Sequence, residues 1–272
     1  MTDTDQYAER LRLSNLLREP ALRAAIQALK LPGGSRGLDV GCGIGLHTLL
    51  LAQAIGPTGH VTGLDLSPEF IALAGEYARK HDLAEQVSFQ EGDMNHLPFE
   101  DDSFDWVWCA DTLHPDPFNE PLPALREFVR VIRPGGRVAL LYWSSQKLLP
   151  GYPLLEARLD AAFAEAAPYT KGVHRPEFHL MRALGWLRDA GLENLTAHTF
   201  TADVYAPLGD ETRRALTMTF QMFWGWLQPS LSAEDWAKFH RLCQPESPEF
   251  ILNQPDYYAF LTYSLFQGKK LR

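Results

Sequence analysis

The stretch Arg36-Gly37-Leu38-Asp39-Val40-Gly41-Cys42-Gly43-Ile44-Gly45 decides the fold. Its first five residues are typical of a short buried strand, and residues 46–54 are typical of a helix. Glycines at every second position of the turn between them remove the β-carbons that would obstruct a ligand. Further along the chain, Asp65 ends a second predicted strand over residues 60–65, where a carboxylate can bind a ribose diol. The chain is therefore predicted to bind a nucleoside-bearing cofactor.

The spacing of the three glycines discriminates between nucleoside cofactors. The dinucleotide fingerprint is G-x-G-x-x-G, in which a pyrophosphate lies against the N-terminus of a helix. Here the third glycine, Gly45, comes one residue early, and Leu46 stands where the dinucleotide glycine would fall. Asp39, two residues before Gly41, would repel a pyrophosphate but not an ammonium or sulfonium group. An NAD-type oxidoreductase on a related sheet is the alternative to a sulfonium cofactor.

The D-x-G-x-G-x-G form resembles the first motif of the class I S-adenosylmethionine-dependent methyltransferases. Further motifs follow in the order of that family: Glu91-Gly92-Asp93-Met94 after a predicted strand, LPF-x-(D/E)-x-SFD over residues 97–105, and RPGGR over residues 133–137. These are similar to the branch that contains the ubiquinone and menaquinone C-methyltransferases and many small-molecule methyltransferases. The resemblance covers residues 36–143.

The resemblance implies S-adenosylmethionine as the cofactor, and a small, hydrophobic or aromatic acceptor that takes the methyl group by in-line displacement. In the family the glycine loop passes under the sugar and methionine moiety, and an Asp at the third strand end binds the adenine amino group. We therefore expect the cofactor to be bound by the residues at the matching positions and beside them: Asp39, Gly41, Cys42, Gly43, Gly45, Asp65, Leu66, Asp93, Met94 and Ala110. Capping of the strand end is the alternative role for Asp39, and tight packing is the alternative for Cys42.

Candidate catalytic residues follow the predicted fourth strand, because open α/β sheets bind ligands at the carboxyl ends of their strands. His114 is the candidate general base for an acceptor that must lose a proton, since an unperturbed imidazole has a pKa of about 6.5. Its alternative role is a hydrogen bond to the backbone. Asp111 is expected to orient His114 or to contact the cofactor, with capping of the next turn as the alternative. Weaker candidates for the pocket are Tyr7, His174, His179 and Tyr205.

The alternation of predicted strands and helices favours a Rossmann-like, doubly wound α/β sheet. We expect seven strands, mostly parallel, with the last one antiparallel as in the family. Residues 1–35 are predicted to form two helices over the cofactor cleft, the second beginning at Glu19-Pro20, and residues 36–145 to form the cofactor-binding core. Residues 146–272 are predicted to complete the sheet and to carry helical lid insertions at about 148–176 and 207–255, within one compact domain.

The second insertion holds a stretch, residues 216–227, that is dense in aromatic and methionine side chains. As a lid, its inner face would line an apolar pocket for the acceptor. Alternatively, the same side chains pack the helix against the sheet or against a second subunit, so a homo-oligomer is possible. A non-catalytic protein that binds S-adenosylmethionine also fits the motifs, because a fold does not by itself establish turnover.

The composition limits the classes of substrate that the chain is expected to bind. The chain carries 25 Lys and Arg against 34 Asp and Glu, and it has no basic stripe for phosphates, so nucleic acid is not expected as a substrate. The arginines near the N-terminus, Arg10, Arg12, Arg18 and Arg23, alternate with acidic residues and are interpreted as an exposed helical face.

Three widely spaced cysteines, with no signal-peptide pattern and no apolar run of membrane-spanning length, indicate a reducing cytoplasm and no membrane span. His174 and His179 lie five residues apart, which is a poor spacing for two metal ligands on a helix. No metal site is therefore expected.

Overall fold

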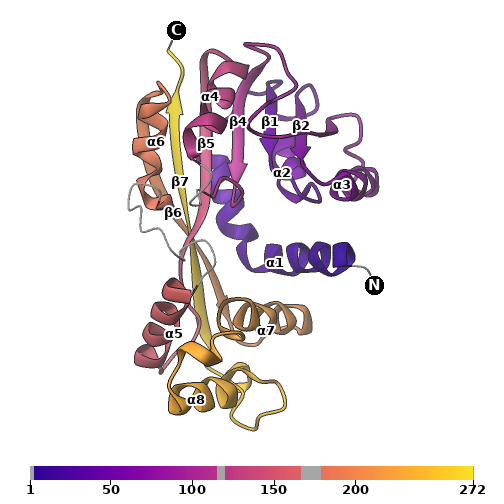
Figure 1. The fold of residues 1–272 in the computed structure, drawn as a ribbon. Helices are drawn as coiled ribbons and strands as arrows, with labels where there is room; N and C mark the ends of the chain where they lie inside the picture. The colour runs from indigo at the N-terminus through magenta and orange to yellow at the C-terminus, as the bar shows by residue number, and fades with distance from the viewer. Residues whose placement is uncertain (1–2, 115–119, 167–178, 272) are drawn as a thin grey trace.

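A seven-stranded sheet in the order β3-β2-β1-β4-β5-β7-β6 organises the chain (Figure 1). The computed structural model describes residues 3–114, 120–166 and 179–271. The strands are β1 (Arg36–Val40), β2 (His60–Asp65), β3 (Val87–Glu91), β4 (Phe104–Ala110), β5 (Ile132–Lys147), β6 (Glu193–Tyr205) and β7 (Tyr258–Lys269). The first five pair in parallel, and β7 runs antiparallel to both of its neighbours. The predicted fold class is confirmed.

The helices that precede and connect the strands are α1 (Asp3–Leu29), α2 (Leu46–Ile55), α3 (Pro68–Lys80), α4 (Pro121–Val131), α5 (Pro153–Ala166), α6 (Ala183–Asp189), α7 (Asp210–Trp224) and α8 (Ala233–Cys243), with short 3₁₀ turns at Leu180–Arg182, Gln228–Ser230 and Ile251–Asn253. Helix α2 begins at the predicted residue, Leu46, and ends one residue beyond the predicted 54. Helix α3 begins with two common N-terminal signals. The hydroxyl of Ser67 caps it by accepting a hydrogen bond from the amide of Phe70, and Pro68 occupies the first turn.

Side chains alternate between the two faces of the sheet and so create two hydrophobic layers. Trp106 and Trp108 of β4 pack with α1 and α2 on one face, whereas Val107 and Cys109 pack with α4 and α6 on the other. The indole of Trp106 also donates a hydrogen bond of 2.9 Å to the hydroxyl of Ser35, just before β1. This two-sided burial explains why β4 reads as an almost continuous apolar run.

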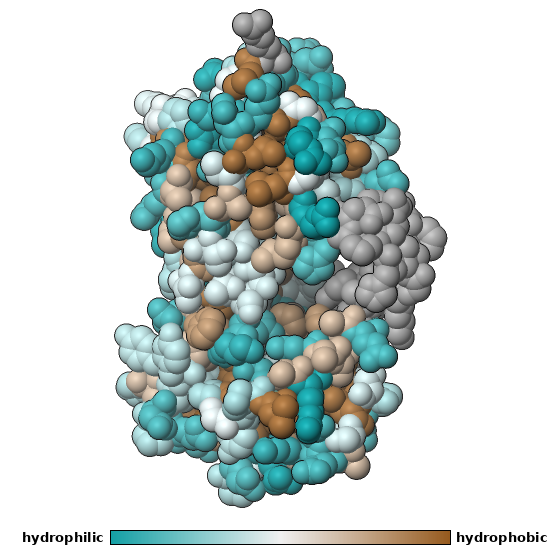
Figure 2. Space-filling model, turned by 90° about the vertical axis from the view of Figure 1, so that its left-hand side faces the viewer, coloured by the Kyte–Doolittle hydropathy of each residue, from teal (hydrophilic) through white to brown (hydrophobic). Residues whose placement is uncertain are grey.

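Strands β5, β7 and β6 continue well beyond the parallel part of the sheet and support a second lobe (Figure 1). Lys147 of β5 pairs with Phe260 of β7, and Tyr205 of β6 pairs with Tyr258. Helices α5, α7 and α8 lie around this extension, and their buried side chains belong to the same hydrophobic cluster as those of α1. In Figure 2 the two lobes meet at a waist, and hydrophobic residues are scattered among hydrophilic ones over both. Among the described residues, no helix is long and apolar enough to span a membrane.

The N-terminal segment differs from the prediction. It forms one helix, α1, that continues through Pro20 instead of breaking there. Figure 1 shows α1 bent between two arms, as expected when a proline removes one backbone hydrogen bond inside a helix. Arg18, expected on an exposed face, is only 9% exposed. This buried arginine lines the cavity at the glycine loop.

The second lobe offers a test of local helix energetics. The hydroxyl of Ser232 caps α8 by accepting a hydrogen bond of 3.1 Å from the amide of Asp235. We expect Ser232→Ala to lower the free energy of unfolding by about 1 kcal/mol, because the amide loses its partner. Urea denaturation measures the change, and Ser232→Asn is the matched control because its side chain still caps the helix. Equal losses in both variants would contradict the capping role.

Candidate functional site

The glycine loop between β1 and α2 adopts a backbone that favours glycine. Gly41, Gly43 and Gly45 have φ values of +73°, +53° and +81°, in the left-handed region. A β-carbon on Gly41 would collide with the side chain of Thr112, after β4. The amide of Gly41 donates a hydrogen bond of 2.7 Å to the carbonyl of Leu64. The loop is therefore fixed against β2 on one side and approached closely by the β4 end on the other.

Asp65, at the end of β2, is oriented by two backbone amides. One carboxylate oxygen accepts a hydrogen bond of 2.9 Å from the amide of Gly43, and the other accepts one of 3.0 Å from the amide of Ser67. Each carboxylate oxygen has a further lone pair for a ligand hydroxyl. The two backbone bonds thus fix the carboxylate at the end of β2, at the mouth of the glycine loop.

A cavity of about 340 Å³ opens over this loop. Helix α1, the glycine loop, the start of α2 and α3, and the ends of β2 and β4 contribute its walls. The lining residues are Tyr7, Leu11, Arg18, Gly41, Cys42, Gly43, Ile44, Leu46, His47, Asp65, Phe70, Ala110, Asp111 and Thr112. Six of the twelve candidate cofactor-binding and catalytic residues are therefore brought together here: Gly41, Cys42, Gly43, Asp65, Ala110 and Asp111.

Asp39 lies beneath the loop and does not line the cavity. It is 1% exposed and accepts a hydrogen bond of 2.6 Å from the hydroxyl of Thr48 in α2. Burial raises the pKa of Asp39 to about 7, Thr48 opposes that rise, and the charge of Asp65 adds to it. The hydrogen bond from Thr48 joins the end of β1 to α2. Gly45 also stands outside the lining, at the N-terminus of α2.

Three further cofactor candidates lie outside the cavity lining. Leu66 is 64% exposed, and Met94 packs against the hydrophobic layer that contains α4. One carboxylate oxygen of Asp93 accepts hydrogen bonds from the amide and side chain of Asn95, at 2.9 and 3.0 Å. These bonds, led by the one from the backbone amide, lower the pKa of Asp93.

Two polar residues of the cavity are held in an uncharged form by burial. Burial lowers the pKa of His47 to about 3, and the neighbouring positive charge of Arg18 lowers it further. Burial also raises the pKa of the Cys42 thiol well above its usual range, with the charges of Asp39 and Asp65 adding to the rise. A raised pKa keeps Cys42 as a neutral thiol, and its side chain is buried in the loop.

Asp111, directly after β4, joins three elements. It has a φ of +50°, and one carboxylate oxygen accepts a hydrogen bond of 2.8 Å from the amide of Trp143 in β5. The other carboxylate oxygen forms an ion pair of 3.3 Å with the guanidinium of Arg18. Asp111 thus holds the buried arginine of α1 against the ends of β4 and β5.

His114 stands apart from the cavity. Its imidazole is exposed, and Nε2 lies 3.0 Å from the backbone carbonyl of Asp111. The ring also lies 6.0 Å, between centroids, from that of Tyr142. It therefore contacts the backbone of Asp111 and not its carboxylate.

Of the weaker pocket candidates, some line the cavity and others do not. Tyr7 lines the cavity, stacked on Phe70 of α3 with their ring centroids 5.5 Å apart. Tyr205 is 67% exposed, His179 caps a 3₁₀ turn, and neither lines the cavity. His174 lies outside the described residues. The part of the chain that the structure describes contains no group of three or more His, Cys, Asp or Glu side chains that could hold a metal ion.

The sequence predicts the N-terminal segment over the cofactor cleft and Tyr7 in the pocket, but it did not identify Leu11 and Arg18 as lining residues. Leu11, Asn15, Arg18 and Leu22 recur at the spacing of one helix face, and this stripe could have revealed that Arg18 is buried. Phe70, His47 and Thr112 carry no comparable signal, because only the packing of α2, α3 and the β4 end brings them to the cavity.

A row of aromatic side chains leads from Asp111 toward the second lobe. Trp143 contacts Tyr263 of β7 at 5.8 Å and Phe223 of α7 at 5.0 Å, both between ring centroids. Phe223 in turn contacts Phe163 of α5 at 5.3 Å, and Phe163 contacts Trp226 at 5.9 Å. The expected aromatic stretch after residue 216 therefore both packs the lobe, through buried Phe220 and Trp224, and extends this row.

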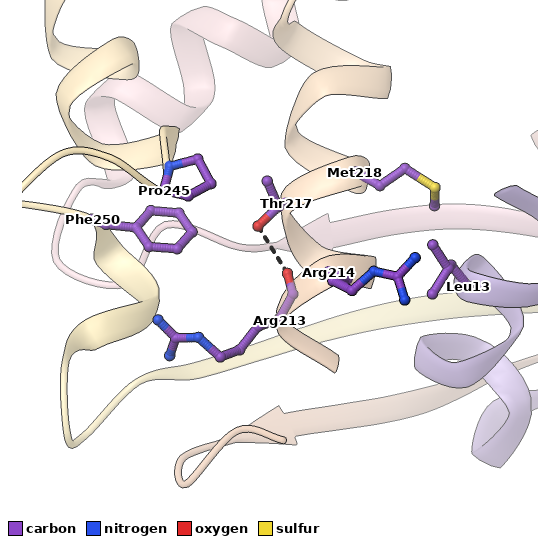
Figure 3. Close-up of a pocket in the computed structure, with 7 residues that line it drawn as sticks. All are labelled: Leu13, Arg213, Arg214, Thr217, Met218, Pro245 and Phe250. Atoms are coloured by element: carbon purple, nitrogen blue, oxygen red, sulfur yellow. Dashed lines mark hydrogen bonds between the residues drawn. The ribbon is translucent and has the colours of Figure 1, made fainter. Parts of the chain in front are cut away.

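A second cavity, of about 490 Å³, lies between α1, α7 and the segment that follows α8, and it shares no residue with the first (Figure 3). Its lining residues are Leu13, Arg213, Arg214, Thr217, Met218, Pro245 and Phe250. The guanidinium of Arg213 already binds the carbonyl of Leu252 and the side chain of Asn253, and that of Arg214 pairs with Glu9 at 3.2 Å. These arginines are therefore engaged in holding the lobe together.

Comparisons with known proteins place the chain in a family. A family model described as a methyltransferase domain matches residues 32–196, more than half of the chain. A demethylmenaquinone methyltransferase of Bacillus licheniformis is 32% identical over 194 residues, which cover 66% of this chain and 80% of that protein. One of Staphylococcus aureus is 42% identical over 124 residues; the match covers 46% of this chain and about half of that relative's length, 49%.

Solved structures show the same fold. The YcgJ protein of Bacillus subtilis superposes with a TM-score of 0.55 over 93% of this chain and 99% of its own, at 20% identity. A putative methyltransferase of Bacillus halodurans gives a TM-score of 0.55 at 19% identity, over 92% of this chain and 99% of its own. These likenesses show the architecture, and the family model and the relatives show the family. The chain therefore belongs to the methyltransferase domain family, among the S-adenosylmethionine-dependent methyltransferases that its first motif resembles.

Proposed function

We propose that this chain binds S-adenosylmethionine in the glycine-loop cavity and methylates a small hydrophobic or aromatic acceptor, most specifically one of the quinone type. The observation that carries the proposal is the position of Asp65. Its carboxylate is oriented by the amides of Gly43 and Ser67 at the edge of a cavity that the glycine loop lines through Gly41 and Gly43.

The residues present suit this cofactor chemically. Asp65 supplies acceptors for ribose hydroxyls, Tyr7 and Phe70 supply apolar surface, and Asp111 and Arg18 supply charges of both signs. A ligand with a methionine moiety carries both an ammonium and a carboxylate group, so a site with both signs of charge matches it. A pyrophosphate, with two negative charges, would face Asp65 and Asp111 with only Arg18 to balance them.

The cofactor, when bound, supplies a methyl group already activated by its sulfonium. The chain has to hold the acceptor in line and to exclude water, because orientation is the main way to accelerate such a displacement. Helix α1 contributes to this exclusion through Leu11 and Tyr7, which close one side of the cavity. We propose α5, α7 and α8, which lie within the predicted insertions at about 148–176 and 207–255, as the acceptor-binding lid. Residues 167–176 of the first insertion lie outside the described part of the chain.

The acceptor class rests on the aromatic row. Trp143, Phe223, Phe163 and Trp226 offer ring faces and edges that suit a planar aromatic molecule. The relatives in Bacillus licheniformis and Staphylococcus aureus carry names that specify demethylmenaquinone as acceptor. A quinone-type acceptor satisfies both observations.

Roles for Asp111 and His114 follow from their positions. We assign Asp111 the orientation of groups at the cavity, because its carboxylate is fixed by Trp143 and Arg18. His114 is the candidate base for acceptors that lose a proton, and its bond to the Asp111 carbonyl keeps the imidazole beside the β4 end. The remaining cofactor candidates, Leu66, Asp93 and Met94, follow β2 and β3 beyond the cavity lining and are assigned to the adenine end of the cofactor.

Asp65→Ala tests the proposal directly. We expect this variant to bind S-adenosylmethionine and S-adenosylhomocysteine more weakly by about 1.5–3 kcal/mol, because hydrogen bonds to a charged group are lost. This corresponds to roughly a tenfold to hundredfold rise in Kd. Isothermal titration calorimetry measures the change, with NAD titrated in parallel against the parent protein.

Glu91→Ala is the matched control, because Glu91 pairs in register with Asp65 but is exposed and does not line the cavity. Its affinity for both adenosyl ligands should equal that of the parent protein. Binding of NAD with no response to either adenosyl ligand would overturn the proposal. Binding of the adenosyl ligands without turnover on any naphthol, phenol or quinol would favour a non-catalytic binding protein.

A further inference from the structure

Arg18 is a buried cation at the wall of the glycine-loop cavity. Among the described residues that line the cavity it is the only lysine or arginine, and its side chain is 11% exposed. The described lining contains two aspartates, Asp65 and Asp111, and no glutamate. His47 adds no charge, because burial lowers its pKa to about 3. Arg18 therefore supplies the only positive charge that the described walls offer to a ligand.

The position of this charge is fixed. The ion pair with Asp111 holds one end of the guanidinium, and Asp111 is itself held by the amide of Trp143. A guanidinium has five N–H donors in a planar fork, and a carboxylate or phenolate oxygen suits that geometry. One ion pair to Asp111 does not exhaust those donors.

Two polar atoms near Asp111 lack hydrogen-bond partners in the structure. These are Nε of Arg18 and the hydroxyl of Tyr263, and both are buried. The Tyr263 ring packs 5.8 Å, between centroids, from that of Trp143, whose backbone amide binds Asp111. The charges of Asp111 and Arg18 both act on the Tyr263 hydroxyl. A buried polar group without a partner costs free energy that a ligand can recover. Arginine, aspartate and tyrosine thus form an incomplete polar cluster next to the cofactor cavity.

We propose that Arg18, held by Asp111 and flanked by Tyr263, binds an anionic oxygen group of a ligand. The inference rests on the proposed function and deepens it, because that function offers two sources of such a group. One is the carboxylate of the methionine half of the cofactor. The other is an ionised hydroxyl of the acceptor, at the start of the aromatic row.

Calorimetry on Arg18→Met and Arg18→Lys separates these sources. S-adenosylhomocysteine carries the methionine-derived carboxylate and 5′-methylthioadenosine lacks it, whereas both contain the adenosine that Asp65 is proposed to bind. If the cofactor is the source, Arg18→Met raises the Kd of S-adenosylhomocysteine about tenfold to hundredfold and leaves that of 5′-methylthioadenosine within about twofold. Arg18→Lys, which keeps the charge but not the fork, lies between the parent and Arg18→Met.

If the acceptor is the source, both adenosyl ligands bind Arg18→Met as they bind the parent. The variant then loses affinity for 1-naphthol, titrated with S-adenosylhomocysteine present, and keeps its affinity for 1-methoxynaphthalene, which cannot ionise. The exposed Arg23→Met on the same helix, which removes an ion pair with Glu19, is the matched control and should change neither affinity.

Tyr263→Phe provides a second test in case the Arg18 variants do not fold. It removes only a hydroxyl, which has no hydrogen-bond partner in the structure. It should weaken the same ligand as Arg18→Met, by a smaller factor. Equal losses for S-adenosylhomocysteine and 5′-methylthioadenosine, or no selective loss for any of the four ligands, would overturn the inference. Failure of the parent protein to bind S-adenosylhomocysteine would instead overturn the proposed function on which it rests.

Discussion

Asp39→Asn is expected to become progressively more stable than the parent protein as the pH rises from 4 to 8. Burial raises the pKa of Asp39 from its ordinary value of 3.8 to about 7, so the folded protein keeps a proton that the unfolded chain releases. A raised folded-state pKa stabilises the fold fully below the unfolded pKa, and this stabilisation is lost as the pH rises through the folded value. Asparagine has no such proton to lose.

The upper limit of this effect is about 4 kcal/mol between pH 4 and pH 8, at about 1.4 kcal/mol for each pH unit between the two pKa values. Asparagine is close in shape to aspartate and keeps an oxygen that can accept the hydrogen bond from Thr48. Urea denaturation of both proteins at pH 4, 6 and 8 measures the difference. A difference that does not change with pH would show that Asp39 is ionised in the folded protein throughout this range.

His47→Leu provides a control of opposite sign. Because burial lowers the pKa of His47 to about 3, the folded protein cannot take up the proton that the unfolded chain binds below its ordinary value of 6.5. The parent protein therefore loses stability from His47 as the pH falls from 6.5 toward 3. The leucine variant lacks this loss and should gain relative stability in acid, where Asp39→Asn shows its smallest advantage. Equal pH trends in the two variants would contradict both assignments.

Local sequence signals were enough to predict the strands of the parallel core and the wall of the cavity that the glycine loop and Asp65 form. Strands β1 and β2 begin and end at the predicted residues, because short buried runs bounded by glycine and aspartate have few alternative registers. The glycine loop and Asp65 come together for the same reason, since both are fixed by the ends of these adjacent strands. The order of the motifs along the chain thus already determined one wall of the cavity.

The opposite wall depends on contacts between distant segments. Pro20 suggested a helix boundary, yet packing of the apolar side chains of α1 against the sheet keeps the helix continuous through the proline. Arg18 was assigned to the surface from its charge, but its place on the stripe of Leu11 and Leu22 buries it beside Asp111. His114 lies outside the cavity because its backbone contact with Asp111 directs the imidazole to solvent.

Gly41→Ala is expected to destabilise the protein by about 2–5 kcal/mol. Two separate costs contribute. A left-handed residue with a β-carbon costs about 1–2 kcal/mol, and Gly41 has a φ of +73°. The new methyl group would also collide with the side chain of Thr112, and such overpacking costs about 1–3 kcal/mol. Because both residues line the cavity, S-adenosylhomocysteine should also bind more weakly, by at least tenfold.

A double-mutant cycle separates the two costs. Thr112→Gly removes every Thr112 atom that the new methyl group would meet, so Gly41→Ala in that background should cost only the strain of the left-handed backbone. Gly191→Ala is the matched control for strain alone, because Gly191 has a φ of +89° and no atom lies within 4 Å of its added β-carbon. Urea denaturation measures all four corners of the cycle and the control. If Gly41→Ala costs the same with and without the Thr112 side chain, the contact between the loop and the β4 end does not constrain the cavity, and backbone strain alone explains the need for glycine.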